Sequence, residues 1–409
     1  MCTVLRKYFS PLLHRNEDLR LLEVFKPLYY ILSIFGLFPY SIDFLYGKKY
    51  LNVAFKSASF TLACNFVVPT VICVFFALHM LELDVASRDN AFTEDEMTKT
   101  NFIIEMVCQF LVCMTAYICA FKNRSLYINV LNEMSGCWTN LPKNVGSKIL
   151  GQLQIKAHCV LFGSILLVPL LESPMTYLSS ATAWKKILVL VTFVLPELIQ
   201  FVLIAFYFVL IMMVVALLEN IEEHVKILYH SKSCWTSSNI VEDAKPLPAS
   251  LRQLRDMYAR ALAVKRQVNA AFQAPLMLLL AQSFHTLISE AHFLFHGLTF
   301  QNDFNVLGVF DCCVWIVLQI IKIYILGHSG AILNQQATEI GRTLHNIPAD
   351  IDEDISLYLE IQHFTTLMKF QAANITVFGY FSLESSLIFN VTASATMYLV
   401  ILVQFDKST

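Results

Sequence analysis

Eight stretches of the chain are apolar over about the length that a helix needs to cross a lipid bilayer, roughly 20 residues. Of its 409 residues 56% are hydrophobic and 15% are charged, whereas soluble proteins carry about 25% charged residues. We therefore expect an all-α integral membrane protein. The eight apolar runs are Leu28–Tyr46, Ser57–Leu81, Phe102–Phe121, Val160–Leu178, Ile187–Leu218, Pro275–Phe300, Val306–Leu333 and Leu387–Phe405.

The distribution of positive charge predicts how these runs are threaded. If Leu28–Tyr46 does not cross, 23 of the 29 Lys and Arg residues fall on the same side as the N-terminus, which the positive-inside rule makes cytoplasmic. The same run contains Gly36, Pro39 and Asp43, which suit a helix through lipid poorly. We predict seven transmembrane helices, a cytoplasmic N-terminus, an extracellular C-terminus and an N-terminal re-entrant or interfacial segment.

The polar stretches divide the chain further. Helical spacing of apolar residues continues into Glu219–Phe272 and Asn334–Ser385, so we expect helices to extend into the cytoplasm. In the second stretch a turn at Asn346–Asp354 should precede a helix that ends near Phe378. The predicted parts are a cytoplasmic N-terminus (1–56), four spans (57–218), a cytoplasmic helical extension (219–274), two spans (275–333), cytoplasmic anchor helices (334–380), and the last span with a short tail (381–409). The formal net charge of −2 gives no reason to expect a nucleic-acid partner.

Ionisable and amide side chains inside the apolar runs are the candidate functional residues, because each is costly in lipid unless it faces protein or water. Converging from several helices, they predict a cavity for a small polar or aromatic ligand; the alternative is that they cap helices or pair with one another. Glu172 is a further acid of this kind. The predicted ligand-binding residues are Glu105, Gln109, Glu197, Gln200, His285, Glu290, Asp311 and Trp315.

Histidines on the sixth run raise the question of a metal. His285, His292 and His296 share one helical face, and a His-x-x-x-His pair can bind a metal. A membrane oxygenase would need further His clusters on other helices, and the remaining histidines are scattered. We therefore expect no metal, no cofactor and no enzymatic activity.

The final run has a polar stripe along an apolar helix. Asn390, Ser394, Met397, Ile401 and then Gln404 and Phe405 recur at helical spacing. Such a stripe suits a pore that several copies line and a hydrophobic ring closes; ordinary packing through small residues is the alternative.

The end of the chain resembles the C-terminal signature of insect gustatory receptors. Gly379-Tyr-Phe-Ser-Leu-Glu, followed by Thr396-Met-Tyr-Leu-Val-Ile-Leu-Val-Gln-Phe405, is similar to that signature except that Met397 separates Thr396 from Tyr398. The resemblance implies a ligand-gated, non-selective cation channel of four subunits, homomeric or heteromeric with other gustatory receptors, in the plasma membrane of sensory neurons. It implies a pore made by the last helix, with gating residues Ile401, Gln404 and Phe405 and with Met397 and Ser394 along the pore.

The resemblance also bears on the ligand. Sugar receptors of the family usually carry Glu after the final Tyr, and Leu399 stands there, which leaves bitter compounds, a fructose-type sugar or a contact pheromone as the expected tastant. Glu290 and Asp311 would suit a cationic or hydroxyl-rich ligand. Two alternatives stay open. One is an insect odorant receptor subunit, and the other is a multi-pass transporter, for which Pro196 and Glu197 in the long fifth run are the one hint.

Overall fold

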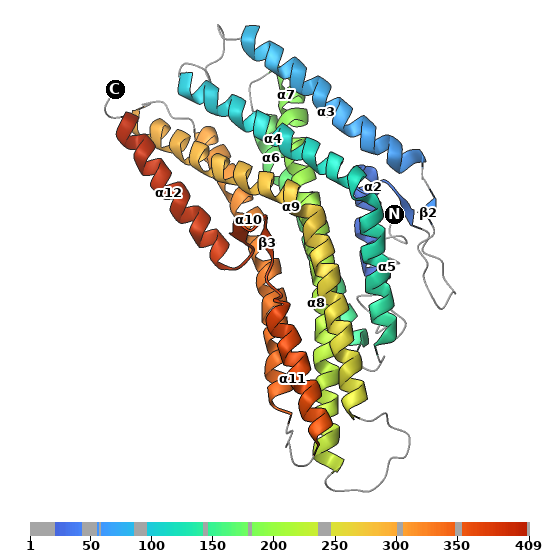
Figure 1. Ribbon diagram of the computed structural model, residues 1–409. Helices are drawn as coiled ribbons and strands as arrows, with labels where there is room; N and C mark the ends of the chain where they lie inside the picture. Colours follow the sequence, from blue (N-terminus) through green and yellow to red (C-terminus); the bar gives the residue numbers. More distant parts are fainter. Residues whose placement is uncertain are drawn as a thin grey trace.

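The computed structural model describes residues 21–42, 55–56, 59–85, 96–141, 146–178, 182–235, 247–300, 306–347 and 354–406. These residues are nearly all helical, as predicted, and form an elongated bundle (Figure 1). The helices are α2 (Leu21–Ile34), α3 (Ser59–Val85), α4 (Glu96–Lys122), α5 (Arg124–Asn140), α6 (Gly146–Leu178), α7 (Ala183–Val189), α8 (Leu195–Trp235), α9 (Leu247–Phe300), α10 (Val306–His345), α11 (Ile355–Phe370) and α12 (Ser386–Asp406), with a π-helix, η1 (Leu190–Val194), between α7 and α8.

Six of the described helical segments are long and apolar enough to cross a membrane. They overlap the second to seventh predicted runs, and they confirm an all-α membrane fold. The predicted seventh crossing is α12, whose described apolar part, Ser386–Ile401, is shorter than the other six. The six segments are Phe60–Glu82, Thr100–Lys122, Lys148–Pro174, Ala183–Leu228, Leu247–Phe295 and Gly308–His345. The direction in which the chain crosses the membrane stays a prediction.

α2 covers the start of the first apolar run, and the chain turns directly after it; residues 43–46 of the run lie outside the described part. α2 has 14 residues, and the chain leaves it through Gly36, whose φ of +72° is one that a side chain resists. Asn65 of α3 donates a hydrogen bond to the Gly36 carbonyl at 2.7 Å, and a Cβ at Gly36 would lie 2.5 Å from the Asn65 backbone nitrogen. Beyond it, β1 (Ser41–Ile42) pairs antiparallel with β2 (Phe55–Lys56). Re-entry into the membrane stays a prediction.

α8 is the central helix of the bundle. Every side chain from Phe201 to Leu218 is buried, so this helix meets other parts of the same chain on all sides. Its continuation to Trp235 runs beside α9, α10 and α11 in the lower half of Figure 1. Tyr258 of α9 packs edge-on against Phe364 of α11 at 5.5 Å. α8, α9 and α10 thus continue as helices beyond the fifth, sixth and seventh runs, and the cytoplasmic placement of these extensions stays a prediction.

The helix expected to end near Phe378 stops earlier, and a β-hairpin follows it. α11 ends at Phe370, and β3 (Thr376–Val377) pairs with β4 (Phe381–Ser382). Phe378 and Gly379 at the turn have φ of +48° and +76°, values that an α-helix excludes. The glycine of the C-terminal signature thus lies in the turn that reverses the chain toward α12. The helical spacing of apolar residues concealed this turn.

Candidate functional site

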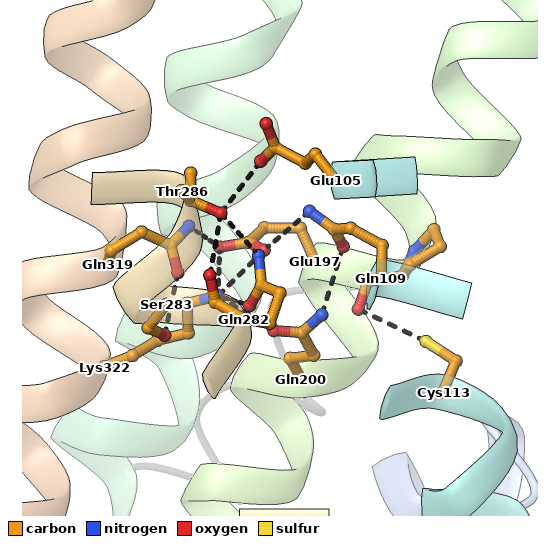
Figure 2. A network of polar contacts seen from close by, with 11 residues as sticks. Glu105, Gln109, Cys113, Glu197, Gln200, Gln282, Ser283, Thr286, Gln319 and Lys322 are labelled. Atoms are coloured by element: carbon orange, nitrogen blue, oxygen red, sulfur yellow. Dashed lines mark hydrogen bonds and ion pairs between the residues drawn. The ribbon is translucent and has the colours of Figure 1, made fainter. Parts of the chain in front are cut away.

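A buried polar network joins four membrane helices in the middle of the bundle (Figure 2). We call it the polar network. Because amides and charges are costly in lipid unless each finds a partner, their gathering in one place is the most informative feature of the interior. Its members are Glu105 and Gln109 of α4, Glu197 and Gln200 of α8, Gln282, Ser283 and Thr286 of α9, and Gln319 and Lys322 of α10.

The centre of the polar network is an ion pair. The Lys322 Nζ lies 2.9 Å from the Glu197 carboxylate, and both side chains are 0% exposed. The ammonium also donates to the amide oxygens of Gln200 at 2.8 Å and Gln282 at 3.3 Å, which uses all three of its hydrogens. Glu197 accepts two further hydrogen bonds, from Gln319 at 3.3 Å and Gln109 at 3.4 Å. This buried ion pair is thus fully surrounded by partners.

Hydrogen bonds from amide and hydroxyl side chains extend the polar network beyond the ion pair. Gln200 donates to the amide oxygen of Gln109 at 3.1 Å, and Ser283 donates to that of Gln319 at 3.0 Å, which connects α9 directly to α10. The Thr286 hydroxyl donates to Glu105 at 3.0 Å. Glu197 follows η1 and Pro196 along the chain. The Pro196 carbonyl accepts a hydrogen bond from the Cys113 thiol at 3.7 Å. π-helices of this kind recur at functional sites.

Glu105 also belongs to a second group of residues, which are all acids. Glu290 interacts electrostatically with Glu105, Glu172 and Asp311, and it hydrogen-bonds Cys312. Glu172, on α6, also interacts with Asp311 and Glu197. Carboxylates that interact in this way repel one another when they are ionised, so the group would favour a cation or a strong hydrogen-bond donor beside it. We call Glu105, Glu172, Glu290 and Asp311 the acidic group.

Two of the predicted ligand-binding residues lie outside both groups. Trp315 is buried against Phe193 of η1, with ring centres 6.4 Å apart, in a cluster with Met106 of α4. His285 is half-buried, and its Nδ1 has no hydrogen-bond partner among the described residues. The side chain of His296 lies outside the described part. Among the described residues, no three His, Cys, Asp or Glu side chains are placed to hold a metal ion.

The structure places Glu105, Gln109, Glu197 and Gln200 in one polar network, where Gln109, Glu197 and Gln200 pair with one another; their role in ligand binding stays a prediction. The residue at the centre of the polar network, Lys322, was not among the predicted site residues. Lys322 lies inside the seventh apolar run. Its signal was available, because a lysine deep in an apolar run is among the most costly residues in a membrane. The other missed members are neutral residues of α9 and α10: Gln282, Ser283, Thr286 and Gln319.

The last helix, α12, is largely exposed, unlike the helices that carry the buried polar network. α12 packs Leu387 and Ala395 inward, and Tyr398 lies edge-on to Phe284 of α9 at 5.7 Å. Its other faces are uncovered: Phe389 is 74% exposed and Met397 is 69% exposed. Of the predicted pore residues, Ser394, Met397, Ile401 and Gln404 are all exposed, whereas the side chain of Phe405 lies outside the described part.

Comparison with known proteins identifies the family. The family described as 7tm Chemosensory receptor matches residues 25–409, which is nearly the whole chain. The chain belongs to the 7tm chemosensory receptor family. Among its relatives, this receptor is 24% identical over 151 residues to gustatory and pheromone receptor 32a of Drosophila melanogaster, covering 37% of this chain and 32% of that protein. It is 23% identical over 148 residues to gustatory receptor 68a of the same species, covering 35% of this chain and 37% of that protein.

Solved structures share the fold of this chemosensory receptor. The insect olfactory receptor OR5 from Machilis hrabei superimposes with a TM-score of 0.69 at 13% sequence identity, covering 94% of this chain and 98% of that one. The same receptor in complex with eugenol gives a TM-score of 0.67 at 15% identity over the same shares of both chains. The aligned regions span about a third of the two Drosophila relatives, whereas the fold agrees over almost all of the chain.

Proposed function

We propose that this chemosensory receptor is a gustatory receptor that acts as a ligand-gated, non-selective cation channel in the plasma membrane of sensory neurons. The family and the gustatory relatives, over the third of their length that aligns, support the gustatory assignment. The receptor would assemble as a homo- or heterotetramer with other gustatory receptor subunits, bind a small tastant, and need neither a cofactor nor a nucleic acid. On this proposal the protein is not an enzyme.

The observation that carries the channel proposal is the uncovered face of α12. A membrane helix with exposed Ser394, Met397, Ile401 and Gln404 needs either lipid or other subunits against it. Ser394 and Gln404 are polar, and in lipid they would be unfavourable. A pore on the symmetry axis of a tetramer supplies water to the polar positions and lets Ile401 form a ring that dewets when the pore closes.

We propose that the ligand binds at the outer side of the polar network, next to the acidic group. There Glu290 and Asp311 are partly buried, and Glu105 links the acidic group to the polar network through Thr286. Acids that repel one another are stabilised by a ligand ammonium or by several hydroxyl groups. This favours a cationic bitter compound or a hydroxyl-rich sugar. His285 and Trp315 would add an imidazole and an indole from the same side of the bundle.

An odorant receptor subunit is the second candidate function, and the likeness of the fold to the Machilis olfactory receptor favours it. The two functions differ in the ligands that reach the receptor, because odorants are volatile and mostly apolar, whereas the acidic group suits a charged or strongly polar compound. Responses to a panel of both kinds of compound distinguish them.

Whole-cell recording tests the proposed function directly. Cells that express the full chain are perfused with quaternary ammonium and amine bitter compounds, sugars and neutral volatile odorants, with surface expression verified by labelling. We expect a cation current evoked by cationic or hydroxyl-rich compounds, and an altered amplitude in Ile401→Ala and Gln404→Ala. Saturable uptake of a compound without any current would contradict the proposal and indicate a transporter.

A further inference from the structure

The base of α12 rests on two glycines of α10. A Cβ at Gly330 would lie 1.9 Å from the Leu383 carbonyl oxygen, and one at Gly327 would lie 2.6 Å from the Glu384 carbonyl oxygen. Both distances are far shorter than the roughly 3.5 Å of an ordinary contact, so any side chain there would displace the backbone of the segment that begins α12. We call this contact between Gly327, Gly330 and Leu383–Leu387 the α12 seat.

The strand that precedes the seat in the hairpin is bound to α9. The Lys265 Nζ donates to the backbone carbonyls of Ala372 at 3.1 Å and Asn374 at 3.0 Å. Asn269, one turn further along α9, donates to the carbonyl of Thr376 at 2.9 Å. Leu383 closes the hairpin by donating its N–H to the Ile375 carbonyl at 2.9 Å. The base of α12 is therefore held between α9 on one side and α10 on the other.

The polar network connects the same two helices. Lys322 of α10 donates to Gln282 of α9, and Ser283 of α9 donates to Gln319 of α10. Lys322 precedes Gly327 by five residues and Gly330 by eight, which places the ion pair about 8 and 12 Å from the seat along a continuous helix. A rigid helix over this distance moves as one body, so a shift of α10 at Lys322 also moves the surface on which α12 rests.

We infer that α10 transmits the state of the polar network to α12, with Gly327 and Gly330 as the positioning residues at the contact. The inference rests on the proposed function, in which α12 forms the pore. Because the glycines allow backbone to touch backbone, no flexible side chain lies between the two helices to absorb a small displacement. α12 has 21 residues, about 30 Å, so a small tilt at its base becomes a larger displacement at Gln404.

The inference predicts that changes at the seat and at the polar network displace the tip of α12. The test is the distance between two spin labels in one chain, introduced as non-natural amino acids at Gln404 and at exposed Ile187, with labelled protein diluted in unlabelled protein. Both labels lie in a single chain, so the measurement needs neither a ligand, nor a current, nor a defined number of subunits. A failure of the channel proposal would appear in the current recordings and would leave this distance measurable.

Gly330→Ala should shift the mean distance between the labels by about 2 Å or more, because its Cβ must displace the Leu383 carbonyl. Gly327→Ala, with the milder overlap, should cause a smaller shift in the same direction and serves if Gly330→Ala does not fold. Lys322→Gln should shift the distance as well, with Ser283→Ala as the milder network variant. Gly308→Ala is the matched control on the same helix, since no atom of the described residues lies within 4 Å of its Cβ.

Two results would overturn the inference. If both glycine variants keep the wild-type distance, the seat does not position α12. If the glycine variants shift the distance but Lys322→Gln and Ser283→Ala leave it unchanged, α10 does not carry the state of the polar network to α12. A shift in the glycine variants and in the network variants, with none in Gly308→Ala, supports both parts of the inference: the seat positions α12, and α10 carries the state of the polar network to it.

Discussion

α8 and α12 are both apolar helices, but they differ in how far their side chains are buried within the chain. Every side chain of α8 between Phe201 and Leu218 is buried, and the ion pair at Glu197 is enclosed by partners. α12 keeps Phe389 and Met397 largely exposed, and only one of its faces packs on α9 and α10. α8 therefore finds all its contacts within one chain, whereas α12 keeps exposed polar residues that lipid alone does not explain. We call the face of α12 that carries the exposed Ser394, Met397, Ile401 and Gln404 its open face. Changes around α8 should therefore alter folding, and changes on the open face of α12 should alter assembly or conduction.

The largest effect on stability is expected at the centre of the polar network. Lys322→Met leaves the Glu197 carboxylate buried without a counter-charge, which should lower the free energy of unfolding by about 3–5 kcal/mol. The measurement is reversible unfolding in mixed micelles of detergent and SDS. Lys322→Met combined with Glu197→Gln should recover most of the loss, because the unpaired charge is gone. Equal stability in the wild type and the single variant would contradict the role of the ion pair.

A smaller loss is expected where α11 is fastened to α9. Arg255 donates to both carboxylate oxygens of Glu360, at 3.1 and 2.8 Å, and Arg252 donates at 3.0 Å. Glu360→Gln should cost about 1.5–3 kcal/mol, because Glu360 is buried and both partners are charged. The matched control is Glu339→Gln, whose pair with the exposed Arg342 should be worth at most about 0.5 kcal/mol. A control that loses as much as Glu360→Gln would show that burial does not set the difference.

A neutral member of the polar network should matter less again. Ser283→Ala removes one hydrogen bond to Gln319, and such bonds between membrane helices average about 0.6 kcal/mol. Thr396→Ala on α12 is the comparison, because among the described residues its hydroxyl bonds only within its own helix, at the Thr392 carbonyl, and the change should cost less. The same unfolding assay checks both variants. A larger loss for Thr396→Ala would break the contrast between the interior and the open face.

The smallest effect on stability is expected on the open face of α12. Met397→Ala should change the unfolding free energy of the dissociated chain by less than about 0.5 kcal/mol, since Met397 is 69% exposed. The same variant should weaken association of the subunits or alter the current, because on the proposed function other copies or permeating ions meet α12 at its exposed face. Native mass spectrometry and recording in parallel separate the two effects. A large loss of stability with no change in assembly or current would contradict this account.

How much of this was readable from the sequence depended on the kind of signal. Long apolar runs fixed the helices, and the cost of burying Glu105, Gln109, Glu197 and Gln200 indicated that they meet. The pairing of Lys322 with Glu197 was not readable, since the partners are 125 residues apart and depend on how α8 and α10 pack. The hairpin after α11 was missed because helical spacing of apolar residues persists across Phe378 and Gly379. The α12 seat depends on where Leu383–Leu387 runs, and the spacing of residues within α10 does not indicate that path.

On the proposed function the open face of α12 lines a pore, and two neighbouring positions on this helix allow a test of that placement. Ser394 is exposed and Ala395 is buried against the rest of the chain. Ser394→Cys and Ala395→Cys are expressed separately and exposed to a charged, membrane-impermeant thiol reagent during a current evoked by an active compound. The wild type, with its native cysteines, sets the baseline. The account predicts rapid loss of current in Ser394→Cys and the baseline rate in Ala395→Cys. Equal rates in the two variants, with a normal current before the reagent is added, would show that the ions pass elsewhere.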